Sequence, residues 1–169
     1  MPLSWSVNVD PHAKPKDTLV NATNPLIING YTHLPATHRG GVAALGNFDG
    51  VHQGHKAVLK TAHAQALELD KPMVAAVFSP HPRRFFQPDC LPFRLMSDSQ
   101  RAKALSLEGA SRIHHLPFTA DMASMSPRDF IQQVLVDGLG LDGVVTGGDF
   151  HFGKGRVGRV DDLKAIGAE

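Results

Sequence analysis

The clearest pattern in the sequence is Val42-Ala43-Ala44-Leu45-Gly46-Asn47-Phe48-Asp49-Gly50-Val51-His52-Gln53-Gly54-His55. Its first four residues form a continuous apolar run, which is typical of a strand buried on both faces of a parallel sheet. The next five residues break the run, and a helical pattern then extends from about Gln53 to Leu69. The apolar residues that recur there at helical spacing are Val58, Ala62, Ala66 and Leu69. The stretch therefore predicts a buried strand, a short turn and a long helix.

The same alternation of strand and helix continues along the chain. Apolar runs predict strands near 42–46, 73–78, 112–117 and 143–147, and Leu26-Ile27-Ile28 is a candidate edge strand. Capping residues at Ser97 and Ser126 indicate two further helix starts. The proline-rich segment 79–92 is expected to be a long loop, and the glycine-rich segment 147–158 precedes a short terminal helix. This order predicts a doubly wound parallel α/β sheet.

Composition excludes several classes of protein. The 169 residues suit one domain, and 42% hydrophobic with 20% charged residues is a globular balance, not a disordered one. The net charge of +1 argues against a general nucleic-acid or membrane-surface binder, and no apolar run is long enough to span a membrane. The single cysteine, Cys90, excludes an internal disulfide and a multi-cysteine zinc site. We therefore expect a cytoplasmic protein whose partners are small molecules, not nucleic acid or membrane.

The predicted sheet points to three segments where a ligand would bind. Ligands of doubly wound sheets bind beyond the carboxyl ends of the strands. Those ends are followed here by Gly46–His55, Ser79–Arg84 and Gly147–Arg156. The first segment also opens the long helix, and a helix start offers free N–H groups and a positive dipole end to an anion.

Two histidines, His52 and His55, lie three residues apart at this helix start. Their imidazole donors can hydrogen-bond phosphate oxygens, and more strongly as negative charge builds up on them. The alternative is that the two histidines cap the helix and cover a solvated face. A zinc site needs a third ligand, and the sequence has no HExxH motif and no cysteine partner for it.

Glycine-rich segments elsewhere match nucleotide-binding motifs only in part. Gly148–Gly155 lacks the final Ser or Thr of a P-loop, whose hydroxyl binds magnesium. Gly153–Gly158 and Gly138–Gly143 fit G-x-G-x-x-G, but neither directly follows a strand and opens a helix. Assignment of the chain as an NAD-dependent oxidoreductase would rest on these partial matches alone.

Four segments together resemble one known family. Residues 46–55 fit G-x-F-D-G-x-H-x-G-H, which contains an HxGH nucleotidyltransferase motif, and residues 78–82 fit F-x-P-H-P. Arg94-Leu95 with the following capped helix is similar to an R-L-T/S stretch, and residues 145–158 to a V-x-G-x-D-F-x-F-G-x-x-R-x-G segment. In this order and spacing they resemble the FMN adenylyltransferase (FAD synthetase) module of the bacterial bifunctional riboflavin kinase/FAD synthetase family.

The resemblance implies a Rossmann-like fold of the HxGH nucleotidyltransferase type and the reaction of FMN with ATP to give FAD and pyrophosphate, with Mg²⁺. It implies that His52 and His55 are catalytic, and it assigns no metal ligand in the chain. The residues implied to bind ATP are Gly46, Phe48, Asp49, Gly50, His52, Gly54, His55 and Arg156. The residues implied to bind the flavin are Pro80, His81, Pro82, Asp149, Phe150 and Phe152.

The resemblance covers residues 25–169, after an irregular leader at 1–24. The family's second phosphate motif, of I-S-S-T-x-I-R type, and its riboflavin kinase domain have no match before Glu169. We therefore expect a C-terminally truncated adenylyltransferase domain that binds adenine nucleotide weakly and forms little FAD alone. The alternatives are another HxGH adenylyltransferase, acting on a pantetheine or nicotinamide phosphate, and a non-catalytic flavin- or nucleotide-binding module.

Overall fold

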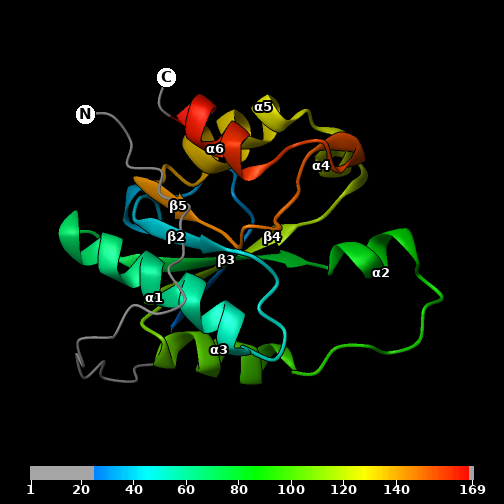
Figure 1. Ribbon diagram of the computed structural model, residues 1–169, viewed down its shortest axis with the longest axis horizontal. Coiled ribbons are helices and arrows are strands. Elements are labelled where there is room, and N and C mark those ends of the chain that lie inside the picture. The colour runs from blue at the N-terminus through cyan, green and yellow to red at the C-terminus, as the bar shows by residue number, and fades with distance from the viewer. Residues whose placement is uncertain (1–24, 168–169) are drawn as a thin grey trace.

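A five-stranded, fully parallel sheet forms the centre of the protein (Figure 1). The computed structural model describes residues 25–167, so the leader expected at 1–24 lies outside the described residues. The strand order is β1-β4-β3-β2-β5. The strands are β1 (Leu26–Asn29), β2 (Val42–Leu45), β3 (Met73–Ser79), β4 (Arg112–Pro117) and β5 (Gly143–Val145). The doubly wound α/β prediction is confirmed, including the edge position of β1.

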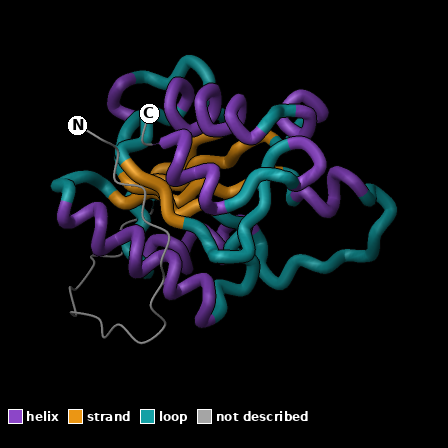
Figure 2. Tube along the Cα trace, turned by 45° about the horizontal axis from the view of Figure 1, so that its top comes forward, coloured by secondary structure: helices purple, strands orange, loops and turns teal. Residues whose placement is uncertain are grey.

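Helices cover both faces of the sheet, as Figures 1 and 2 show. One face carries α1 (Gln53–Glu68) and α3 (Asp98–Leu107). The other carries the short α4 (Ala120–Ser124) and α5 (Pro127–Asp129), the π-helical segment η2 (Phe130–Gly138) and α6 (Val160–Gly167). Three short pieces complete the order: α2 (Pro82–Phe86) and the 3₁₀ turns η1 (Ala36–His38) and η3 (Lys154–Arg156).

The alternation of side chains along β2 divides the core into two layers. Val42 and Ala44 pack with Val58 and Leu59 of α1 on one face. Ala43 and Leu45 pack on the other face with apolar residues of η2 and α6. Because the four β2 residues are all buried, with at most 1% of their surface exposed, the strand must be apolar throughout.

The predicted helix starts are confirmed by their hydrogen bonds. The Ser97 hydroxyl accepts from the Gln100 N–H at 3.2 Å, and the Gln100 side chain accepts from the Ser97 N–H at 2.9 Å, which makes a complete capping box. The Ser126 hydroxyl accepts from the Asp129 N–H at 3.1 Å. The helix that starts there continues as η2 and ends at Gly138.

The prediction that 79–92 is all loop was wrong in one part, because α2 forms within it. Pro82 occupies the first turn of α2, where a missing N–H costs nothing, and His81 caps it by accepting the Arg83 N–H at its Nδ1 atom at 3.0 Å. The fourth predicted strand, 143–147, is also shorter than expected, since its strand β5 ends at Val145.

The strand order places a crevice beside β2. From β2 the chain crosses through α1 to β3 on one side, whereas β5 pairs with β2 on its other side. The segment after β2 leads to α1 on one face, and the segment after β5 leads to α6 on the opposite face. Such a divergence opens a binding site at the carboxyl ends of the two strands. Within residues 25–167, no helix has the length and apolar character needed to cross a membrane.

Candidate active site

A cavity of about 1320 Å³ lies at this crevice. Its walls come from the loop after β2, the first turn of α1, the end of β3 with α2, and the segment 147–156 after β5. The basic side chains that line it are His52, His55, His81, Arg83, His151, Lys154 and Arg156. The phenylalanines that line it are Phe48, Phe78, Phe86, Phe118, Phe130, Phe150 and Phe152. The cavity therefore combines groups for an anion with surfaces for a flat aromatic ligand.

The two histidines of the HxGH motif lie together at the start of α1. Their rings stack with centroids 3.7 Å apart and planes inclined by 23°, and the ring of Phe48 meets His55 edge-on at 5.3 Å. His52 directly precedes α1, but its side chain makes no capping hydrogen bond. The first turn of α1 contains no acidic residue, so this positive helix end faces the cavity without a side-chain counter-charge of its own. The geometry thus disfavours the simple capping alternative.

Burial makes two of the cavity histidines weak bases. It lowers the pKa of His55, and the nearby charge of His52 lowers it further, against the opposing effect of Asp49 and Asp149. Burial also lowers the pKa of His81, where Asp49 again opposes the shift. With pKa values below the usual 6.5, both imidazoles are mainly neutral at pH 7 and present one N–H donor each.

Among residues 25–167, two polar atoms of cavity-lining residues are buried without a hydrogen-bond partner, Asn47 Oδ1 and His55 Nδ1. A buried polar atom left unpaired costs roughly 1–3 kcal/mol. Polar groups that stay unpaired at a concave surface are typical of sites where a ligand completes the hydrogen bonds.

Glycines bring the backbone of this region into close contact with its neighbours. A Cβ atom at Gly54 would lie 3.2 Å from Cε1 of His52, so glycine leaves room for the histidine ring. Gly50 has a φ of +84°, and a Cβ atom there would lie 3.0 Å from Cδ1 of Leu95. Both positions therefore favour glycine for local steric reasons.

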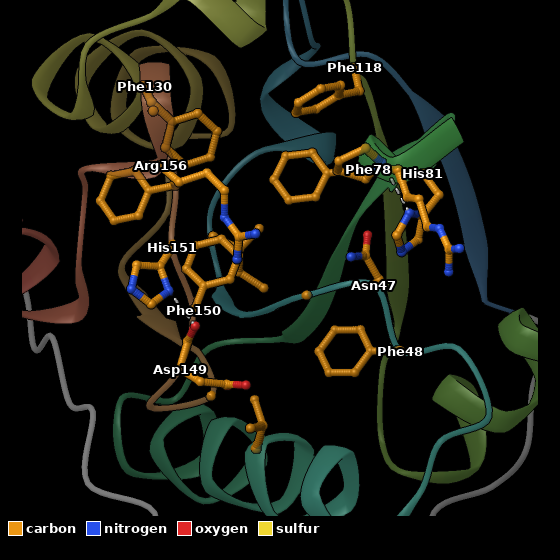
Figure 3. A pocket seen from close by; sticks show the side chains of 18 of the residues that line it. Asn47, Phe48, Phe78, His81, Phe118, Phe130, Asp149, Phe150, His151 and Arg156 are labelled. Carbon is orange, nitrogen blue, oxygen red and sulfur yellow. Dashed lines mark hydrogen bonds between the residues drawn. The ribbon is translucent and has the colours of Figure 1, made fainter. Parts of the chain in front are cut away.

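The opposite wall consists of the segment after β5 (Figure 3). The rings of Phe150 and Phe152 stack at 5.7 Å, and two backbone hydrogen bonds between Phe152 and Gly158 close the segment into a loop. The guanidinium of Arg156 extends into the cavity in Figure 3, and it has no bonding partner among residues 25–167. A guanidinium without a protein partner is available to bind a phosphate.

Eleven of the residues singled out from the sequence line this one cavity. They are Gly46, Phe48, His52, Gly54, His55, His81, Pro82, Asp149, Phe150, Phe152 and Arg156.

Three of the expected residues, Asp49, Gly50 and Pro80, do not line the cavity. Pro80 lines an adjacent pocket of about 530 Å³. The carboxylate of Asp49 accepts backbone N–H groups of Leu95 and Met96, so it acts on the structure of the loop.

Several lining residues were not singled out from the sequence. Asn47 and Lys154 lie within two of the predicted segments, whereas Phe86 and Phe118 lie outside all three. Phe86 follows the proline-histidine-proline segment by four residues, and one helical turn brings it back to the cavity. The proline at the first position of α2 was the signal for that turn. Phe118 follows β4. It reaches the cavity because β4 pairs with β3, and the sequence alone does not show that pairing.

The site contains little that would hold a metal by itself. Within residues 25–167 there is no group of three or more His, Cys, Asp or Glu side chains placed to bind one. Asp149 is the only carboxylate among the residues that line the cavity.

The comparisons with known protein sequences agree on one family. The sequence model of the family described as FAD synthetase matches residues 34–169. A bifunctional riboflavin kinase/FMN adenylyltransferase from Pseudomonas fluorescens is 43% identical over 141 residues, which are 83% of this chain and 45% of that protein. A protein of the same description from Escherichia coli K12 is 32% identical, with 85% of this chain and 46% of that protein covered. The chain thus spans less than half the length of these curated relatives.

A solved structure has the same fold. It is described as the crystal structure of a macrolide-efflux protein from Streptococcus pneumoniae, and it superposes with a TM-score of 0.73. The match covers 84% of this chain and 55% of that one at 24% sequence identity, so it bears on the fold alone.

Proposed function

Because the chain belongs to the FAD synthetase family, we propose that its cavity transfers AMP from ATP to FMN, giving FAD and pyrophosphate. A phosphate oxygen of FMN attacks the α-phosphorus of ATP in line. A new P–O bond forms on that phosphorus while its bond to the oxygen bridging to the β-phosphate breaks. Pyrophosphate leaves with that oxygen and its electron pair. No covalent enzyme intermediate is needed, so the protein contributes mainly position and charge stabilisation.

One observation carries the proposal: a single cavity holds a paired histidine motif at a helix start and an aromatic wall in which Phe86, Phe118 and Phe150 keep part of their surface exposed. The first feature suits a polyphosphate and the second suits a planar ring system. FMN and ATP each combine an anionic group with an aromatic one. Three of the four sequence segments of the family, 46–55, 78–82 and 145–158, contribute lining residues to this cavity, and Leu95 of the fourth bonds Asp49 of the first.

His52 and His55 are the proposed contacts to the ATP phosphates. The imidazole of His55, whose pKa is lowered by burial, donates one N–H, the ring of His52 beside it adds an N–H donor, and the first N–H groups of α1 add further donors along the helix axis. These donors are fixed before substrate binds, because the rings stack on each other and Phe48 supports His55. Preorganised donors stabilise the charge that develops on the phosphate oxygens in the transition state. Arg156 is the proposed cationic partner from the opposite wall.

The flavin ring is proposed to bind against the segment His81-Pro82 and the half-buried ring of Phe150, which the buried Phe152 supports from behind by stacking. His81 is held as the cap of α2 and by an edge contact with Phe93 at 5.0 Å. Phe86 adds an aromatic face that is 63% exposed in the described structure, so a ligand can cover it. Aromatic surfaces of this kind bind a flat ring by stacking and by excluding water.

Mg²⁺ is proposed to enter with ATP. This ion keeps several waters and commonly uses one or two carboxylates together with substrate phosphates, and the single lining carboxylate of Asp149 fits that arrangement. When bound, it would neutralise charge on the phosphates. We further propose that residues 25–169 form the adenylyltransferase unit and that it works in the cytoplasm, which agrees with the single free Cys90.

The proposal is tested by calorimetric titration of the chain with ATP, FMN and NAD⁺, each with MgCl₂. We expect binding of ATP and of FMN, with FMN displaced by FAD, and no binding of NAD⁺. Each titration is repeated with the Arg156→Ala variant, which should weaken ATP but leave FMN unchanged. Tighter binding of NAD⁺ than of ATP would contradict the proposed function. So would an Arg156→Ala variant that loses affinity for FMN and keeps its affinity for ATP.

A further inference from the structure

We propose that the start of α3 is a positioning clamp for the loop Gly46–Val51, with Asp49 and Arg101 as its two polar links. Arg101 is then a positioning residue for adenylyl transfer, since it bonds the loop but does not line the cavity. This inference rests on the proposed function. It adds residues outside the cavity that position the residues proposed to bind ATP.

The loop needs such a restraint, because its backbone is unusual. Phe48 has a φ of +51° and Val51 a φ of +38°, on either side of Gly50 at +84°. Residues with side chains rarely adopt these angles, least of all β-branched valine. They persist only where the surroundings over-determine the conformation, which is frequent at functional sites. Phe48 is 1% exposed and Val51 is buried, so packing supplies one part of the restraint.

Asp49 supplies the first polar link. Its carboxylate accepts the Leu95 N–H at 2.9 and 3.0 Å and the Met96 N–H at 3.0 Å. A Cβ atom at Gly50 would lie 3.0 Å from Cδ1 of Leu95, so Leu95 contacts the loop closely at this point. The residues just before α3 are thereby fixed against the middle of the loop. The capping box at Ser97 in turn holds these residues to α3.

Arg101 supplies the second link from the body of α3. It is 4% exposed, and its Nη1 donates to the backbone oxygen of Asn47 at 3.2 Å. Its Nη2 donates to Asp98 at 3.0 Å. One planar guanidinium therefore connects the loop to the first turn of α3. A lysine offers a single ammonium without this fixed fork and cannot reproduce both bonds with the same geometry.

The position of the loop determines what the cavity presents. Asn47 and Phe48 line the cavity, and Phe48 contacts His55. The loop also leads directly into His52 at the start of α1. A shift of the loop therefore displaces the proposed phosphate contacts, and misplacement by about 1 Å can cost on the order of a hundredfold in rate. Neither hydrogen bond of Arg101 goes to α2 or to the segment after β5.

The test compares Arg101→Lys with a matched control, Arg94→Lys. Arg94 also pairs with Asp98, at 2.6 Å, and it bonds nothing in the loop. Two readouts are taken on the chain: the ring signals of His52 and His55 in NMR spectra, and the rate of FAD formation at saturating substrates. We expect Arg101→Lys to shift both sets of histidine signals and to lower the rate by roughly tenfold or more, with KM for FMN within about twofold. Arg94→Lys should leave the signals and the rate near wild type.

Asp49→Asn tests the same clamp from the loop side and keeps the shape of the side chain. It should shift the same histidine signals, and the double variant should be less impaired than the product of the two single effects. Equal behaviour of Arg101→Lys and Arg94→Lys, or unchanged histidine signals in both clamp variants, would overturn the clamp. Failure of both clamp variants to fold would also overturn it, since the links would then serve the fold. The NMR readout needs no FAD, so it tests the clamp even where the chain alone forms little FAD. Failure of the wild-type chain to bind ATP and FMN would count against the proposed function and not against the clamp.

Discussion

Replacing His114 with leucine should reduce the loss of folding stability that the protein shows as the pH is lowered. His114 lies in β4, is 1% exposed, and its Nδ1 atom has no hydrogen-bond partner among residues 25–167. Burial lowers its pKa to about 4, and the nearby positive charges of Arg112 and His38 contribute in the same direction. The folded protein therefore holds this imidazole in its neutral form at neutral pH.

The sign and the size of the effect follow from the two pKa values of His114. In the unfolded chain the imidazole takes up a proton near pH 6.5, whereas in the folded chain it does so only near pH 4. Between these values the unfolded state binds more protons, so stability falls as the pH is lowered through this window. The shift of about 2.5 units corresponds to about 3 kcal/mol once the pH is below 4, and to about 2 kcal/mol at pH 5.

The measurement is urea unfolding of the wild type and of His114→Leu at pH 7 and pH 5. The wild type should lose about 2 kcal/mol more than the variant over this interval. Burial also lowers the pKa of His55, His81 and His115, but these groups are present in both proteins and their effects cancel in the difference. The same pH dependence in both proteins would refute the reasoning that His114 is buried as a neutral base.

Three further substitutions test the cavity. Gly54→Ala places a methyl group 3.2 Å from the His52 ring, so FAD formation should fall while the thermal midpoint is kept; an unchanged rate would show that the ring position is not critical. Arg156→Ala should raise KM for ATP by about tenfold without affecting the midpoint, because the guanidinium bonds no described residue. Phe86→Ala removes one stacking surface, so KM for FMN should rise roughly several-fold in steady-state kinetics while KM for ATP stays unchanged. Equal increases of both KM values would argue against a flavin role for Phe86.

The layered fold was readable from the sequence because its strands are buried on both faces. Continuous apolar runs such as Val42–Leu45 are typical of strands buried on both faces, and the helices that begin after Ser97 and Ser126 carry explicit caps. The short α2 was missed because a proline-rich stretch was interpreted as loop, although proline is favoured at a helix start. The π-helical geometry of η2 has no sequence signal that we recognise.

The site was predictable where its residues adjoin in sequence. His52 directly precedes α1 and His55 lies in its first turn, so their proximity follows from their spacing at the helix start. The contact of Asp49 with Leu95 and Met96 joins residues more than forty positions apart, and only the packing of α3 against the loop creates it. The expectation that the 169 residues alone form little FAD stays a prediction.

The most direct test of the account is FAD formation by a chimera that joins this chain to the remainder of the Pseudomonas fluorescens relative. Chromatography follows FAD after mixing with FMN, ATP and MgCl₂, with the unmodified chain and the relative's remainder alone as controls. The account predicts FAD from the chimera, none from the remainder, and a rate lowered roughly a hundredfold or more by His55→Ala. That substitution should cost the fold about 1 kcal/mol or less, because His55 is only partly buried on the first turn of α1. A folded His55→Ala chimera that forms FAD at the full rate would contradict the claim that this histidine pair acts on the transferred phosphate.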